Sequence, residues 1–155
     1  MPKAEERERV ITFEYSLGVR ISRSQVRSSL AKVRDLLLSH EINGGDKKLE
    51  MDTICGIHGC GTAACIGGWV SIFTIGFEGV TMEKRAIIAR LFHELQHTEE
   101  GSSKVRLHKL FYNHTGTKDY NSPRIAATAI QRYLDGKNPW PKGVMPDVLR
   151  YKRKR

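Results

Sequence analysis

The sequence has few cysteines and no segment with the character of a membrane anchor or a secretory signal. Three cysteines occur in 155 residues, and this odd number does not provide the paired thiols of a disulfide-stabilised secreted domain. An apolar stretch, TAACIGGWVSIFTIGF, is too short and too interrupted by glycine to cross a bilayer. The first residues, MPKAEERERV, are charged where a secretory signal requires an apolar run. We therefore expect a cytoplasmic protein with no membrane partner.

Positive charge is what the chain contains in excess. Lysine and arginine number 26 against 17 aspartates and glutamates, which gives a formal net charge of +9. An excess of this size favours association with an anionic partner, although it carries no information on the fold. The length and the hydrophobic content of 39% are those of one globular domain.

Apolar residues recur at helical spacing along most of the chain, and this pattern predicts a mainly α, single compact domain. In the first helix the repeat is Val26, Leu30, Val33 and Leu37, which would share one buried face. About five helices are expected: from Ser22 to about His40, from Thr62 through the apolar stretch, from Thr81 to about Thr98, from Ser102 or Ser103 through Phe111, and from Ser122 to the turn at Gly136.

The two ends of the chain are expected to differ from this helical centre. Residues 1–9 are polar and predict a flexible N-terminus, and VITFEYSL at 10–17 predicts one short N-terminal strand or hairpin at most. The helical domain would then cover residues 10–140. Residues 141–155 contain prolines and end in YKRKR, which predicts an extended, basic C-terminal tail.

Basic residues of the first helix and of the tail are candidate contacts to nucleic acid. Arginines recur along one edge of the first helix with nearly the helical period, an arrangement that can follow a row of phosphates. The alternative is a surface helix with solvated arginines and a solvated tail. The candidate phosphate contacts are Arg20, Arg23, Arg27, Arg34, Lys152, Arg153, Lys154 and Arg155.

The stretch HGCGTAACIGGW, residues 58–69, allows two interpretations that involve chemistry. A zinc knuckle would use four ligands, Cys55, His58, Cys60 and Cys65. Structural zinc sites usually separate two ligand pairs by a longer loop or helix, which is absent here. A catalytic thiol would be Cys65, placed in the first turn of a helix capped by Thr62, where the helix dipole favours a thiolate. The sequence singles out no base for such a nucleophile.

The third interpretation of this stretch is structural, and we prefer it. Glycines permit a tight turn, small residues let another backbone approach closely, and a tryptophan supplies a large buried anchor. On this view the cysteines behave as small core hydrophobes. The residues with this structural role are Cys60, Gly61, Thr62, Cys65, Gly68 and Trp69.

HELQH, residues 93–97, fits the H-E-x-x-H pattern of zinc hydrolases. His93 and His97 would bind zinc and Glu94 would serve as the base for a bound water. A third ligand would be His108 or Glu100. These side chains lie opposite the apolar face of their helix, so an exposed polar face is the alternative, and no metal or other cofactor is required.

The segment CGTAACIGGW, at residues 60–69, resembles the C-G-T-x-x-C-x-x-G-W/H signature of small uncharacterised proteins of phages, prophages and related bacterial genomes. LEMD at 49–52, KLFYN at 109–113 and RIAATAIQRYLDG at 124–136 resemble flanking elements of those proteins, so the likeness covers roughly residues 26–136. The resemblance implies a phage-type accessory protein of helical fold, with no established activity and no catalytic residue to transfer.

Together these observations predict a small, basic, phage or mobile-element accessory protein without catalytic activity in the cytosol of a host cell. Its expected partner is anionic, either nucleic acid or host machinery that handles nucleic acid. One alternative is a zinc-dependent hydrolase that uses HELQH. The other is an inhibitor or modulator of a host defence or regulatory protein, and the oligomeric state is left open.

Overall fold

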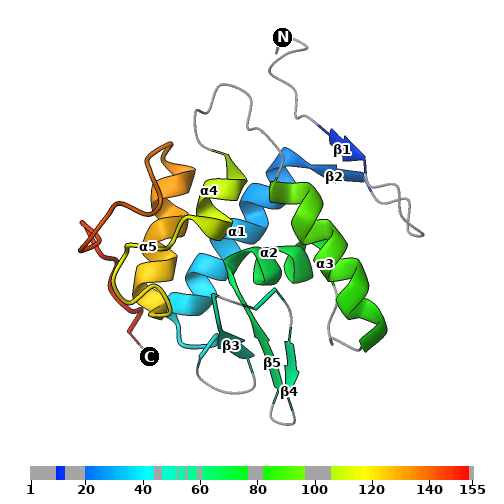
Figure 1. The fold of residues 1–155 in the computed structure, drawn as a ribbon, viewed down its shortest axis with the longest axis horizontal. Coiled ribbons are helices and arrows are strands. Elements are labelled where there is room, and N and C mark those ends of the chain that lie inside the picture. The colour runs from blue at the N-terminus through cyan, green and yellow to red at the C-terminus, as the bar shows by residue number, and fades with distance from the viewer. Residues whose placement is uncertain are drawn as a thin grey trace, which may run out of the picture.

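The predicted mainly α, single domain is confirmed by a computed structural model, which describes residues 10–12, 20–43, 47–51, 53–54, 56–58, 61–76, 82–96 and 106–153. The predicted flexible N-terminus, residues 1–9, lies outside the described part. Figure 1 shows the helices around a common centre, and their bounds are α1 Arg23–Leu38, α2 Ile66–Ile75, α3 Met82–Gln96, α4 Leu107–Tyr112 and α5 Pro123–Leu134.

Short strands accompany the helices. The predicted N-terminal strand is β1, Val10–Thr12, which pairs antiparallel with β2, Arg20–Ser22. A second sheet, which the sequence did not predict, has the strand order β3-β5-β4. Its strands are β3 Lys47–Leu49, β4 Gly56–His58 and β5 Gly61–Ala64, with β5 parallel to β3 and antiparallel to β4.

The helix predicted to begin at Thr62 begins later, so this expectation is wrong. Thr62 lies in β5, where it is in register with Ile57 of β4. Cys65 is the N-cap of α2, and its backbone N–H donates to the carbonyl oxygen of Thr53 at 2.6 Å. Pairing with two neighbouring strands gives the backbone of residues 61–64 hydrogen bonds that compete with those of a helix.

The first helix begins at the predicted N-cap and buries the predicted apolar face. Ser22 is its N-cap and forms a capping box with Gln25, in which each side chain bonds to the backbone of the other residue. The four apolar residues of the predicted repeat, Val26, Leu30, Val33 and Leu37, are all buried. Burial of this stripe is the main force that holds an amphipathic helix on a domain.

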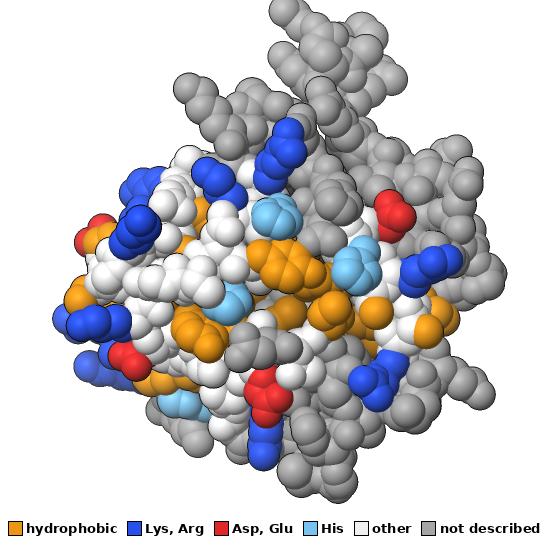
Figure 2. Space-filling view, viewed as in Figure 1, with side chains coloured by type: hydrophobic (Ala, Val, Ile, Leu, Met, Phe, Trp, Pro, Cys, Tyr) orange, Lys and Arg blue, Asp and Glu red, His pale blue; other side chains and the backbone are white. Residues whose placement is uncertain are grey.

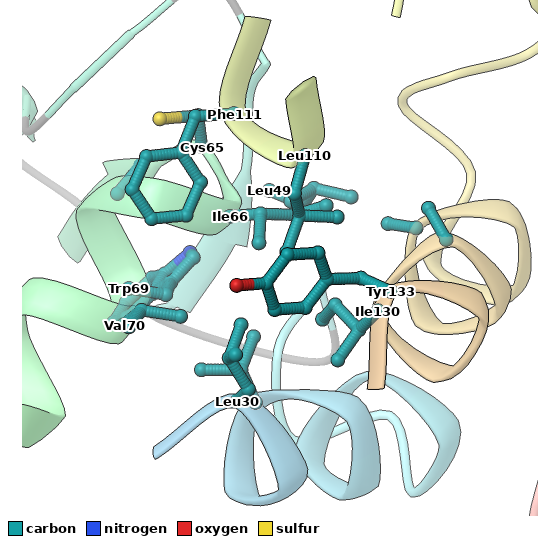
Figure 3. Close-up of a cluster of buried hydrophobic side chains, with 14 of the residues drawn as sticks. Leu30, Leu49, Cys65, Ile66, Trp69, Val70, Leu110, Phe111, Ile130 and Tyr133 are labelled. Carbon is teal, nitrogen blue, oxygen red and sulfur yellow. The ribbon is translucent and has the colours of Figure 1, made fainter. Parts of the chain in front are cut away.

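The hydrophobic core lies where α1 meets α5 and α2. Helix α2 also contacts α3 and α4, so it is covered on several sides. Figure 3 shows core side chains from these elements pointing toward one another, including Leu30, Ile66, Trp69, Ile130 and Tyr133. In α5, Ala126, Ala129, Ile130 and Tyr133 are buried and Ile125 is only partly buried.

The C-terminal segment, residues 141–153, contains no helix and is bound along the domain rather than projecting from it. The Trp140 indole donates to the carbonyl oxygen of Leu110 at 2.7 Å, and Met145 is buried. Further on, the Leu149 N–H donates to the hydroxyl of Thr128 in α5 at 2.9 Å. These contacts attach the segment to α4 and α5. Among the described residues, none of the helices has the length and apolar character needed to cross a membrane.

Candidate functional site

The arginines predicted along α1 make contacts within the protein. The Arg27 guanidinium donates to the carbonyl oxygen of Leu134, at the C-terminus of α5, over 3.0 Å. Arg34 donates to the side-chain oxygen of Gln131 at 2.7 Å and forms an ion pair with Asp35 at 3.1 Å. Both arginines are only partly exposed. They link α1 to α5, and Arg27 satisfies a carbonyl that the end of a helix leaves without an intrahelical partner.

The other predicted phosphate contacts divide into those that the structure describes and those that it does not. Arg23 is half-buried at the start of α1, and Arg20 is described only as backbone, in β2. Lys152 and Arg153 are exposed. Lys154 and Arg155 lie outside the described residues. Contact between any of these side chains and phosphate stays a prediction.

Most of the net positive charge lies in residues 106–153. This stretch has ten lysines and arginines and three aspartates, a balance of +7 out of the chain's +9. Figure 2 shows lysine and arginine side chains gathered on the side where Figure 1 places α5 and the C-terminal segment. We call the exposed cations of this stretch the basic surface: Arg106, Lys109, Lys118, Lys137, Lys142, Arg150, Lys152 and Arg153.

Two loops that are distant in sequence are held together within the basic surface. The Lys118 N–H donates to the carbonyl oxygen of Gly143 at 3.2 Å, and the Gly143 N–H donates to Gly116 at 2.9 Å. The Thr117 hydroxyl donates to the carbonyl oxygen of Pro141 at 3.0 Å. This pairing brings Lys118 close to the loop that carries Lys142. Sequence reasoning missed both lysines because each stands alone in the sequence, although a charge count over the last third would have found the excess.

The end of the C-terminal segment lies against the C-terminus of α1. The Lys152 N–H donates to the carbonyl oxygen of Leu38 at 2.9 Å, and its ammonium group is 3.4 Å from the carboxylate of Asp35. The Tyr151 ring stacks on the His40 ring with 4.0 Å between centroids and 28° between planes. The Arg124 guanidinium carbon lies 5.7 Å from the Tyr151 ring centroid. An aromatic pair therefore stands among cationic side chains at this edge of the basic surface.

Cys65 is a buried thiol at the start of α2. It is 2% exposed, it belongs to the core, and its sulfur accepts the N–H of Gly68 at 3.4 Å. Cys55 and Cys60 lie outside the described residues, and His58 is described only as backbone in β4. The zinc knuckle therefore stays a prediction, and the burial of Cys65 leaves a substrate no access to its sulfur as the protein stands.

The small residues of α2 lie where other parts of the chain approach closely. A Cβ atom at Gly68 would collide with the carbonyl oxygen of Ile54, and one at Gly67 would collide with the rings of Phe92 and Phe111. The Trp69 indole donates to the carbonyl oxygen of Lys48 at 2.9 Å, which attaches α2 to β3. The structural interpretation of HGCGTAACIGGW expects close approach of another backbone at the small residues and a tryptophan anchor. The contacts of Gly68 and Trp69 are consistent with it.

In the described part of HELQH, His93 and Glu94 are exposed, whereas Leu95 is buried in the core. His93 and Glu94 lie on the surface of α3, and His108 lies on the surface of α4. His93 packs edge-on to Phe92, with 5.6 Å between centroids, and His108 lies 5.1 Å from the ring of Tyr112. His97 and Glu100 lie outside the described residues. Within the described ranges, no three histidine, cysteine or acidic side chains are grouped as metal ligands would be.

The phenol of Tyr112, on α4, has a pKa that is shifted from its ordinary value. Burial, and secondarily the nearby charge of Cys65, raises the pKa of the Tyr112 phenol above its ordinary value of 10.0. Its ring also contacts Phe92 at 5.4 Å between centroids. The phenol is therefore neutral at physiological pH and available only as a hydrogen-bonding group.

The fold and these sites define a small, mainly α domain with a basic surface on its C-terminal third and a buried thiol at the start of a close-packed helix. No family model, curated protein or solved structure matches the chain. Its function must therefore be argued from its own residues.

Proposed function

We propose that the protein binds nucleic acid through the phosphate backbone, by means of the basic surface. The observation that carries this proposal is the concentration of charge: a balance of +7 within residues 106–153, with eight cations exposed. Phosphate contacts need cationic and polar side chains on one connected surface and do not need a cleft. Within the basic surface, the pairing of two loops brings Lys118 close to Lys142, and Lys152 and Arg153 add the charge of the C-terminal segment.

The acidic residues of the same stretch oppose this field only weakly. They are three aspartates, Asp119, Asp135 and Asp147, all exposed. The carboxylate of Asp135 already accepts a hydrogen bond from Gln131 at 3.1 Å. Exposed carboxylates are screened by solvent and salt, so their repulsion of a phosphate is much smaller than the combined attraction of the surrounding cations.

Lys152 is available to a phosphate although it pairs with Asp35. Both side chains are largely exposed, at 54% and 43%, and they are 3.4 Å apart. A surface ion pair of this kind contributes about 0 to 1 kcal/mol. The exchange of Asp35 for a phosphate oxygen therefore costs little.

A non-catalytic role is part of the proposal, as is an accessory role in a phage or mobile element in the cytosol. The burial of Cys65 and the exposure of His93 and Glu94 support the first part. The second part rests on the likeness of CGTAACIGGW to the phage-protein signature. A host protein that handles nucleic acid is the alternative partner for the same surface.

The test is fluorescence anisotropy with mixed-sequence DNA and RNA of about 20 nucleotides at about 50 and 200 mM salt. With six or more phosphate contacts, we expect affinity to fall about a thousandfold between these salt concentrations. Lys142→Glu should weaken binding about tenfold at low salt through lost attraction and new repulsion.

The matched control is Arg90→Glu. It makes the same charge change at an exposed position of α3, which Figure 1 places on the side of the domain opposite α5 and the C-terminal segment. We expect its affinity to stay within about twofold of the parent. Absence of binding at low salt, or an equal loss in the two variants, contradicts the proposal. Capture of a host protein by a chain that binds no oligonucleotide would support the alternative partner instead.

A further inference from the structure

The stacked rings of His40 and Tyr151 are exposed at the edge of the basic surface. Tyr151 is 37% exposed and His40 is also exposed, although they stack with 4.0 Å between centroids. Aromatic rings of a folded domain usually lie in its core. A ring pair that solvent reaches offers a flat surface on which a further ring can stack.

His40 stands at a position where a side chain has a conformational cost. It follows Ser39, the C-cap of α1, and its φ is +67°, in the left-handed region. Glycine is the usual residue at this position because it has no Cβ to strain. The histidine therefore has a backbone cost that glycine would not have, and residues with such a cost occur at binding sites more often than elsewhere.

The backbone on which Tyr151 is mounted is held on both sides. Before it, the Arg124 guanidinium donates to the carbonyl oxygen of Leu149 at 2.8 Å, and after it, the Lys152 N–H donates to Leu38 at 2.9 Å. The ring is thus placed before any ligand arrives. Pre-organisation of this kind lowers the entropy that binding must overcome.

Cationic side chains flank the Tyr151 ring, while Glu41, next to His40, is an exposed carboxylate. Arg150, Lys152 and Arg153 flank Tyr151 in sequence and are exposed, and Arg124 lies over its ring at 5.7 Å. Aromatic faces interleaved with basic side chains are how proteins bind single-stranded nucleic acid, with bases on the rings and phosphates on the cations. A duplex presents only base edges and backbone, since its bases are already stacked and paired.

We propose that a base of single-stranded nucleic acid stacks on the His40–Tyr151 pair while its neighbouring phosphates contact Arg150, Lys152 and Arg153. This inference rests on the proposed function and deepens it, because it names the strand form that the basic surface selects. Tyr151 is then the residue that distinguishes a strand with bases from a bare chain of phosphates.

The experiment compares two fluorescent ligands of about 12 residues, oligothymidylate and an abasic strand of the same length. We expect the parent protein to bind oligothymidylate about tenfold more tightly than the abasic strand, the effect of one stacked base. Tyr151→Ala should remove that preference and leave the abasic affinity unchanged. Tyr151→Phe should retain the preference, since it keeps the ring.

Tyr112→Ala is the matched control, because Tyr112 is a tyrosine of similar exposure, 39%, on α4. It should leave the preference for oligothymidylate intact. If the parent binds both strands equally but with strong salt dependence, the stacking inference is wrong and the proposed function stands. If neither strand binds, both fail. A Tyr151→Ala variant that weakens both strands equally, or a parent that prefers duplex over single strand, also overturns the inference.

Discussion

Replacement of Gly68 by alanine tests whether α2 depends on close backbone contact. Gly68 is buried in the first turn of α2, and its N–H donates to the sulfur of Cys65. A Cβ atom there would collide with the carbonyl oxygen of Ile54 and would lie 2.9 Å from the Cβ of Ala64. Because both neighbours belong to short, hydrogen-bonded segments, relief requires movement of backbone rather than rotation of a side chain.

The expected change in the free energy of unfolding is the difference between two effects. Alanine has a higher helix propensity than glycine, which favours the variant by about 1 kcal/mol. Overpacking against a backbone oxygen opposes it by about 3 kcal/mol, the upper part of the usual range. The net loss is about 2 kcal/mol, which for a chain of this length lowers Tm by about 4 to 8 °C.

Urea and thermal unfolding followed by circular dichroism measure this loss, with two variants for comparison. Gly67→Ala should cost less, since its new Cβ meets the rings of Phe92 and Phe111, which can turn. Ala86→Gly, on the exposed surface of α3, calibrates helix propensity and should cost about 1 kcal/mol. A Gly68→Ala variant as stable as the parent, or more stable, would refute the close-contact argument.

Two further predictions concern α1 and α4. Arg27→Ala should lower the free energy of unfolding by about 1 to 2 kcal/mol, because the Leu134 carbonyl loses a charged donor. Ser28→Ala, at an exposed position of the same helix, should change it by less than about 0.5 kcal/mol in the same urea titration. The raised pKa of Tyr112 means that the unfolded chain loses this phenolic proton before the folded protein does. Its contribution to stability is therefore complete below pH 10.0 and is lost as pH rises above that value. In an absorbance titration at alkaline pH, Tyr112→Phe should remove a late-titrating phenolate; disappearance of an early one would contradict the assignment.

Local sequence determined the elements that can be recognised without a partner. Helix α1 carries its own start signal in Ser22 and Gln25. Helix α5 has Ser122 as its N-cap, Pro123 in the first position and Gly136 with φ of +76° just past its end. Caps and a 3.6-residue apolar period act within a few residues, so they can be read from one segment alone.

The candidate site was only partly predictable. Lys152 and Arg153 were expected to be exposed cations and they are, whereas Arg27 and Arg34 bond to α5. Nothing local distinguishes an arginine that reaches solvent from one that reaches a carbonyl on a neighbouring helix. That distinction depends on which helix lies alongside.

The amino-acid sequence by itself determined the mainly α class, the burial of the α1 stripe and the excess of positive charge. Tertiary structure alone decided that residues 61–64 form a strand, because their hydrogen-bond partners come from β3 and β4. It also decided that Tyr151 stacks on His40, since the C-terminal segment must first bind along α5. Local signals act through a few neighbouring residues, whereas strand pairing, stacking and the grouping of charges depend on segments that only folding brings together.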